Sequence, residues 1–360
     1  MTSLTVLETF VSLTVQVTLL ICVAAWVVRR QHDGTVADCC WATLHACILA
    51  LTVAAFLLPH LRLITWADLN PASNRIAVYS ALSVAGRICG WIWLSGAAAI
   101  IAVCIGGIFR ANFHVRAAAV DTGLERRLLE LVPSLAALKR PIEIRVSQDC
   151  LSPFCWQLHR PIICVPDMLR GFPSAEQAAI VRHELAHLRL QHPLHLFLQR
   201  MVEAIYWFHP LVWWVSRQAA AAREFRCDRE AVNSRCEVAD YLRSLLRLIE
   251  SQVTAVSRLP AGLGFLGDSS LLSRRASLLA ESLDSPIVRN SGWRPAVVLL
   301  TAACLYVVLW LPVNPLASQR ADLSPWPSWS TRALDAIGIP LRDYEVDGHR
   351  LGRHRHLHTR

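Results

Sequence analysis

Long apolar stretches constrain the fold of this 360-residue chain more than any other feature. A helix needs roughly 20 residues to cross the hydrocarbon core of a bilayer. The stretches of about this length are Thr9–Val28, Cys40–Leu58, Ile88–Phe109 and Pro295–Leu311. Hydrophobic residues make up 54% of the chain, and the mean hydropathy of +0.37 is too high for an ordinary soluble protein. The sequence therefore predicts a multi-pass α-helical membrane protein, in contact with the lipid bilayer, with about four transmembrane helices.

Basic residues indicate the orientation of these helices. Arg29 and Arg30 follow the first stretch, and a basic segment that begins at Arg110 follows the third. Because basic loops stay in the cytoplasm, we expect the N-terminus outside and the long central region in the cytoplasm. The predicted parts are three transmembrane helices with short loops in 1–110, a cytoplasmic domain in 111–294, a fourth transmembrane helix in 295–312 and a short, largely irregular extracytoplasmic tail in 313–360.

The charged residues exclude several function classes. Lys139 is the only lysine among 36 basic residues, so neither a P-loop nor a Ser-x-x-Lys acylation motif has the residue it requires. The net charge of +9 would suggest nucleic acid in a soluble protein. Here the basic residues flank apolar segments, where they set orientation and contact anionic headgroups. We therefore expect no direct binding of nucleic acid.

The central region contains a motif with metal-binding spacing. Capping-box spacing at Ser174 and a helical period of apolar residues predict a helix that carries His183, Glu184 and His187. On a helix, positions i and i+4 share a face, so both imidazoles can reach one metal ion while Glu184 leans toward its open side. This geometry suits Zn²⁺, which takes three protein ligands in catalytic sites. Chance gives roughly 0.02 such motifs in a chain of this composition.

A second helix offers a third ligand. His209-Pro210 interrupts one helical stretch, and the next is expected from near Leu211 to about Ala231. Glu224 and Asp228 lie one turn apart on it. Glu224 would bind the metal, and Asp228 would accept the N–H of a ligand imidazole on the side away from the metal and so fix its tautomer. The alternative is a solvated charged face, because arginines surround both carboxylates. The zinc motif nearby favours the metal site.

These segments together resemble a known family. The run Pro161-Ile-Ile-Cys-Val-Pro166, the His-Glu-Leu-Ala-His helix, the aromatic run that begins at Tyr206 and the segment Glu224-Phe-Arg-Cys-Asp228 look like the antirepressor zinc metallopeptidases of the BlaR/MecR type. The layout of three spans, a cytoplasmic domain and a fourth span is also similar. The resemblance implies an inserted α+β zincin domain of the gluzincin class, in a bacterial inner (cytoplasmic) membrane.

The resemblance also implies residue roles. His183, His187 and Glu224 would bind zinc, Glu184 would be the catalytic general base, and the strands around Glu143–Val146 and Pro161–Val165 would pair with a substrate. Two positions depart from the family pattern: Gln157 stands where glycine is common, and His192 where an acidic residue is frequent. The chain also has only a short segment after the last span and lacks the acylation lysine, so we expect it to lack the penicillin-binding sensor domain.

The expected chemistry is peptide hydrolysis, in which a metal-activated water loses its proton to Glu184. A second donor to the developing oxyanion is expected. The residue types that could supply it occur at His192, His195, Tyr206, His209 and Arg223. The aromatic cluster around Tyr206 is interpreted either as an interfacial belt or as core beneath the zinc helices.

The leading hypothesis is a membrane-embedded zinc endopeptidase, a signalling antirepressor. The resemblance implies that its partner is its protein substrate, a cytoplasmic transcriptional repressor of the winged-helix type. Self-cleavage is a further expectation. One alternative is a housekeeping membrane protease of the HtpX type, which shares the zinc helix. Another is a signalling receptor that keeps the fold without the activity. Intact His183, Glu184, His187 and Glu224 argue against the last alternative.

Overall fold

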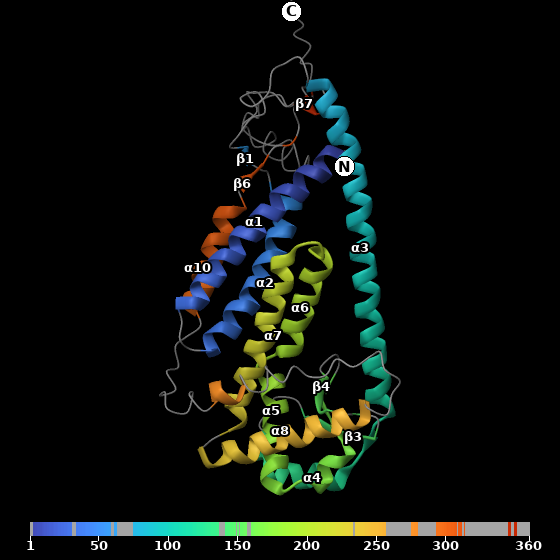
Figure 1. The fold of residues 1–360 in the computed structure, drawn as a ribbon, viewed down its shortest axis with the longest axis vertical. Coiled ribbons are helices and arrows are strands. Elements are labelled where there is room, and N and C mark those ends of the chain that lie inside the picture. Colours follow the sequence, from blue (N-terminus) through green and yellow to red (C-terminus); the bar gives the residue numbers. More distant parts are fainter. Residues whose placement is uncertain are drawn as a thin grey trace, which may run out of the picture.

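Three apolar helices dominate the fold. In the computed structural model the described residues are 3–30, 34–58, 61–62, 75–136, 141–148, 150, 152–156, 160–232, 235–256, 275–279, 293–307, 309–311, 313, 345–346 and 349–350. The helices α1 (Ser3–Arg30), α2 (Gly34–Leu57) and α3 (Arg75–Ala117) are long and apolar enough to cross a membrane (Figure 1). They contain the first three apolar stretches except Leu58, which confirms the prediction of a helical membrane protein.

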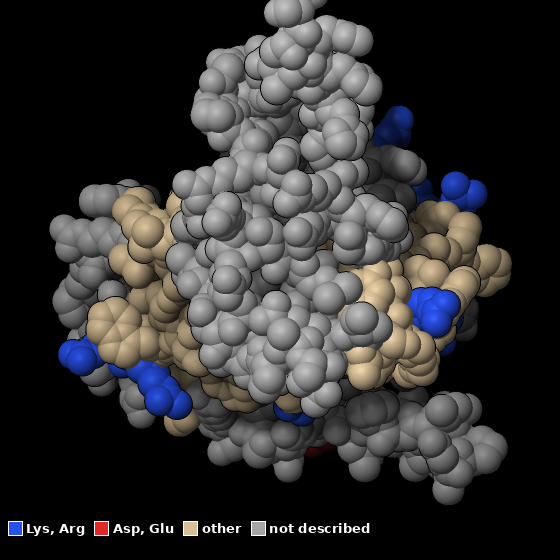
Figure 2. Space-filling model, turned by 90° about the horizontal axis from the view of Figure 1, so that it is seen from above, with Lys and Arg blue, Asp and Glu red and all other residues tan. Residues whose placement is uncertain are grey.

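The surface at one end of the molecule agrees with this assignment. Figure 2 views the molecule from the end that lies at the top of Figure 1. The described surface there is mostly neither basic nor acidic, and Lys and Arg side chains lie at its margin. Large apolar side chains of α3 are also exposed, including Trp91 and Val103, each 73% exposed. Such exposure is unfavourable in water but is expected for a helix that faces lipid.

The fourth apolar stretch forms a shorter helix than the sequence predicts. Helix α10 (Trp293–Tyr306) packs against α1 and α2 but has 14 residues. After it, β6 (Leu309–Trp310) is extended and pairs in parallel with β1 (Leu61–Arg62). Polar side chains of α1 hold this extended segment, because Gln16 Nε2 donates to the Leu309 carbonyl at 2.5 Å and Glu8 accepts from the Trp310 indole at 2.6 Å. Helix α10 ends at Tyr306, and a fourth crossing stays a prediction.

Helices α6 (His192–Ile205) and α7 (Pro210–Ala231) form a hairpin beside the membrane helices (Figure 1). The prediction of a helix from near Leu211 to Ala231 is confirmed. Both helices of the hairpin pack against α2, and α6 also packs against α3. One buried apolar cluster joins residues of α1, α2, α6, α7 and α10. The hairpin belongs in sequence to the predicted cytoplasmic domain but packs in space with membrane helices, so the proposed domain division stays a prediction.

The aromatic cluster lies at the tip of this hairpin. Phe208 stacks on Phe10 of α1 with ring centroids 4.4 Å apart, and Trp214 meets the edge of Trp41 of α2 at 5.9 Å. The Trp207 indole donates to the carbonyl of Trp93 on α3 at 3.2 Å. These aromatic rings therefore form a packed core against the membrane helices, and neither of the two earlier interpretations describes this position fully.

A small α+β unit lies at the other end of the molecule (Figure 1). Its sheet has the order β2-β3-β5-β4, in which β3 and β5 are parallel and the other neighbours antiparallel. The strands are β2 (Ala119–Val120), β3 (Glu143–Ser147), β4 (Phe154–Trp156) and β5 (Ile162–Pro166). The surrounding helices are α4 (Thr122–Leu131), η3 (Pro133–Leu135), η4 (Asp167–Gly171), α5 (Ser174–Arg189) and α8 (Arg235–Val256).

Helix α5 begins at Ser174, as the sequence predicts, but the predicted capping box does not form. Ser174 does not cap the helix: its hydroxyl accepts from Arg127 at 3.2 Å. Gln177 instead turns back, and its Nε2 donates to the carbonyls of Leu169 and Phe172, both at 2.9 Å. This buried amide joins the start of α5 to η4, so the helix is anchored to the end of the sheet.

In the predicted tail, the structure describes residue 313 and two short strands. β7 (Glu345–Val346) pairs in antiparallel with β8 (His349–Arg350). The prediction of an irregular tail otherwise lies outside the described residues.

Candidate metal centre

Helices α5 and α7 bring the three predicted metal ligands together. His183 Nε2 and His187 Nε2 lie 3.2 Å apart, one turn from each other on α5. Glu224 of α7 faces both: its Oε2 is 3.6 Å from His183 Nε2, and its Oε1 is 3.6 Å from His187 Nε2. The structure thus gathers two imidazoles and one carboxylate, although 37 positions separate His187 from Glu224 in the sequence numbering.

These three donors fit a zinc ion. Tetrahedral bonds of about 2.0–2.2 Å separate neighbouring ligand atoms by roughly 3.3–3.6 Å. The observed separations lie between 3.2 and 3.6 Å, with each imidazole facing a different oxygen of the Glu224 carboxylate. Three protein ligands also leave one position of a tetrahedral ion open, which is the arrangement of catalytic zinc sites.

Two of the three donors already have the protonation state that a metal requires. Burial and the neighbouring His183 lower the pKa of His187 to about 3, so its imidazole is neutral. Burial alone would raise the pKa of Glu224, but the two imidazoles and Arg275 hold it well below its usual range. Burial opposes protonation of His183 too, yet the carboxylates of Asp228 and Glu224 outweigh it and raise the pKa of His183 to about 10. A metal must therefore displace a proton from His183.

Glu184 lies between the two imidazoles in the sequence of α5 and is 8% exposed. Burial raises the pKa of Glu184 to about 7, and the ionised Glu224 adds to the effect. A carboxylate with a pKa near neutrality can both take and return a proton, which is the property required of a general base that later acts as an acid.

Asp228 lies behind His183, on the side away from Glu224. Its Oδ1 is 3.2 Å from His183 Nδ1, and the side chain is 1% exposed. The Tyr241 hydroxyl of α8 donates to the same Oδ1 at 2.5 Å and lies 2.8 Å from His183 Nδ1. The arrangement can hold the imidazole with Nε2 directed at the metal position.

Sequence reasoning missed two members of this site. Tyr241 contacts both His183 and Asp228, and Arg275 reaches Asp228 and Glu224, the latter with Nη1 3.3 Å from Oε2. Neither residue lies at a recognisable spacing from the pair His183 and His187 in the sequence. A clue for Tyr241 is its place as a large side chain on the inward face of the amphipathic helix α8, but this position looks like ordinary core.

The five candidates for an oxyanion donor occupy different places. The Tyr206 hydroxyl bonds to Thr52 of α2 at 2.7 Å, and His209 Nε2 bonds to Thr18 of α1 at 3.0 Å, so both serve the contact with membrane helices. His192 and His195 lie with Asp38, next to the ring of His187. Arg223 is buried on α7 beside Glu224. The geometry brings none of these donors into a defined oxyanion position.

The substrate-pairing strands implied by the resemblance need a correction. β3 and β5 are inner strands, because β2 and β4 pair with their outer sides. An added strand needs a free edge, which among the described strands belongs to β2 and β4. Of these two edge strands, β4 packs against α5. The charge of Glu184 adds to burial in raising the pKa of Cys155 on β4, which agrees with their proximity.

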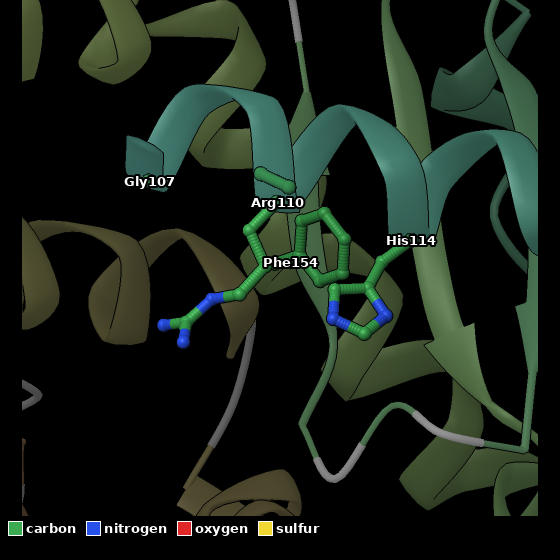
Figure 3. A pocket seen from close by; sticks show the side chains of 5 residues that line it. Gly107, Arg110, His114 and Phe154 are labelled. Carbon is green, nitrogen blue, oxygen red and sulfur yellow. The ribbon is translucent and has the colours of Figure 1, made fainter. Parts of the chain in front are cut away.

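A hollow adjoins the edge strand β4. It has a volume of about 400 Å³ and lies between β4 and the end of α3, where Gly107, Arg110, Ala111, His114 and Phe154 line it. In Figure 3 the ring of Phe154 lies beside the imidazole of His114, while the Arg110 guanidinium points away from both.

Comparisons with known proteins agree with these features. The profile of the family described as BlaR1 peptidase M56 matches residues 5–279. The chain is also similar to the protein named Regulatory protein BlaR1 from Bacillus licheniformis, with 32% identity over 77 residues. This similarity spans 21% of the present chain and 13% of that relative. The family match includes all three apolar helices and both helices of the metal centre. The chain belongs to the BlaR1 peptidase M56 family.

Proposed function

We propose that this protein is a membrane-embedded zinc endopeptidase. One observation carries the proposal: the Nε2 atoms of His183 and His187 and the carboxylate of Glu224 converge at separations that suit a tetrahedral zinc ion. Membership of a peptidase family supports it. When bound, the metal would acidify a water molecule and polarise a peptide carbonyl.

The remaining chemistry falls on side chains of this chain. Glu184 is the group suited to take the proton of the attacking water on its carboxylate and to pass it to the departing amine. Asp228 and Tyr241 hold His183 by its Nδ1 atom. Backbone groups of the edge strand β4 would align an extended peptide beside α5.

The proposed substrate is a cytoplasmic transcriptional repressor of the winged-helix type, and the protein would also cleave itself. The name of the relative from Bacillus licheniformis, a regulatory protein, supports a signalling role over general protein turnover. We place the protein in a bacterial cytoplasmic membrane, which its chain would cross four times. The zincin domain would face the cytoplasm, where a repressor is accessible.

The test uses the purified full-length chain in lipid nanodiscs with zinc and a winged-helix repressor encoded by a neighbouring gene. Mass spectrometry of new termini should show one dominant cut in the repressor and none with Glu184→Gln, which keeps the metal ligands. Cleavage of many unfolded proteins with no preference would indicate the housekeeping alternative. Equal signalling by the wild type and Glu184→Gln in cells would indicate a receptor without activity.

A further inference from the structure

The second metal ligand of α5 contacts a chain of polar groups that ends in a membrane helix. His187 directs Nε2 toward Glu224, while its Nδ1 lies 2.9 Å from His192 Nδ1. The other nitrogen of His192, Nε2, lies 3.3 Å from Oδ2 of Asp38. Asp38 belongs to α2, one of the three helices that can cross a membrane.

The turn between α5 and α6 makes this contact possible. Gln191 has a φ of 56°, the one positive value at a non-glycine residue in the described part of the chain. This left-handed residue reverses the chain directly after α5, so the first residue of α6, His192, folds back onto His187. For a residue other than glycine this conformation is unfavourable, so the surrounding contacts must hold it.

One assignment of protons satisfies every bond in the chain. A nitrogen that binds a metal uses its lone pair, so a neutral His187 carries its proton on Nδ1 and donates it to His192. His192 Nδ1 then accepts, which leaves its proton on Nε2. That proton is donated to the Asp38 carboxylate. The direction of the bonds therefore runs from the metal ligand to the membrane helix.

The surroundings favour an ionised carboxylate at the end of this chain. Asp38 and His192 are 2% and 3% exposed, so their hydrogen bonds lie in a medium of low dielectric constant. Arg226 of α7 lies with Nη1 2.9 Å from the same Oδ2 of Asp38 and compensates its charge.

A second metal ion is the competing interpretation, because Asp38, His192 and His195 could together hold one, as could His187, His192 and Cys227. Arg226 argues against the first group, since its guanidinium already occupies the carboxylate and would repel a cation. The second group would require His187 to bind two metal ions, one on each ring nitrogen, and so to lose both of its ring protons. The hydrogen-bonded chain accounts for the same atoms without a second ion.

We propose that Asp38 is a positioning residue of the metal centre, which fixes the tautomer and orientation of His187 through His192 and so makes metal affinity depend on the placement of the membrane helix α2. The inference rests on the proposed metal site. Hydrogen bonds weaken steeply with length and misalignment, so a shift of α2 by about 1 Å would loosen the ligand. By reciprocity, a metal that binds more tightly with α2 in place also holds α2 in place.

The experiment measures zinc affinity of the full-length protein in nanodiscs by competition with a chromophoric chelator. Asp38→Asn removes the charge that fixes His192, and affinity should fall about 10- to 100-fold. Trp214→Leu is the matched control: it removes the contact of Trp214 on α7 with Trp41 on α2 but leaves Asp38, its Arg226 partner and the His192–Asp38 bond in place, and affinity should stay within about threefold of wild type. An equal loss in both variants would overturn the proposal, because Asp38 would then act only by joining two helices.

A rescue variant separates positioning from folding. In His192→Asp a carboxylate oxygen stands two bonds from Cβ, as Nδ1 does in histidine, so it can accept directly from His187 Nδ1 without Asp38. The double variant His192→Asp/Asp38→Asn should therefore bind zinc within about threefold of wild type. A double variant as weak as Asp38→Asn, or wild-type affinity in Asp38→Asn, would overturn the inference. Failure of the wild type itself to bind zinc would instead defeat the proposed function.

Discussion

The guanidinium group of Arg275 binds both oxygens of the Asp228 carboxylate, with Nε 2.8 Å from Oδ2 and Nη2 2.5 Å from Oδ1. Asp228 also accepts a hydrogen bond from Tyr241 and faces His183. A buried carboxylate with this bidentate partner has a fixed plane. It can therefore fix the imidazole ring beside it, which is the basis of the first prediction.

Asp228→Asn should weaken zinc affinity about 10- to 100-fold without unfolding the protein, because the amide keeps the shape but loses the charge that holds His183 Nδ1. Chelator competition measures the affinity. The matched control is Asp240→Asn on α8, whose carboxylate forms an exposed pair with Arg243. Exposed pairs contribute little, so this variant should bind as the wild type does. If Asp228→Asn bound zinc as tightly as the wild type, Asp228 would have no role in orienting His183 and would serve only the folded structure.

Removal of a single ligand should release the metal. One zinc ion per chain should copurify with the wild type. His183→Ala, His187→Ala and Glu224→Gln should each lose most of it, because two remaining ligands bind weakly. Glu184→Gln should keep full zinc, since Glu184 is not among the three converging donors. Elemental analysis by mass spectrometry gives the ratio. Full zinc in a protein that lacks both histidines would refute the assignment.

The contact between α3 and the hairpin predicts a difference between two glycines. A Cβ atom on Gly96 would overlap the indole ring of Trp207, whereas nothing lies within 4 Å of a Cβ on Gly106. Gly96→Ala should therefore lower the free energy of unfolding by about 1–3 kcal/mol, the usual cost of overpacking, and Gly106→Ala should be nearly neutral. Thermal unfolding in nanodiscs compares the two. Equal midpoints would mean that the hairpin does not pack on α3 at this point.

The orientation in the membrane is predicted from the basic residues after α1 and α3. A short epitope inserted near His32 or after Glu130 of α4 should be reached by antibody only from the cytoplasmic side, and one near Asn70 or Ser328 only from the outside. Glu130 is exposed and lies on α4, which packs against α5 of the α+β unit. External labelling at Glu130 would invert the orientation and remove a cytoplasmic substrate from reach.

Local patterns in the sequence determined the membrane helices and the candidate ligands. Apolar runs specify α1, α2 and α3 because hydrocarbon length and backbone hydrogen bonding leave a spanning segment few alternatives. The positions of His183 and His187 one turn apart follow from helix geometry alone. Glu224 and Asp228 are four positions apart, so helix geometry alone also places them on one face of α7. In the structure Glu224 Oε1 lies close to His187 Nε2, as the prediction of a shared metal site requires. The metal-binding roles themselves remain proposals.

Only the tertiary structure decided which distant segments meet. Strands β3 and β5 lie in the middle of the sheet because of how the strands pair. The composition of a single strand does not encode this pairing. The extended segment after α10 is bound by side chains of α1, a contact across almost the whole chain. The approach of His192 to Asp38 likewise depends on how α6 packs against α2. Helical and strand periodicity report which face of one element is buried, and the partner of that face is set by long-range packing.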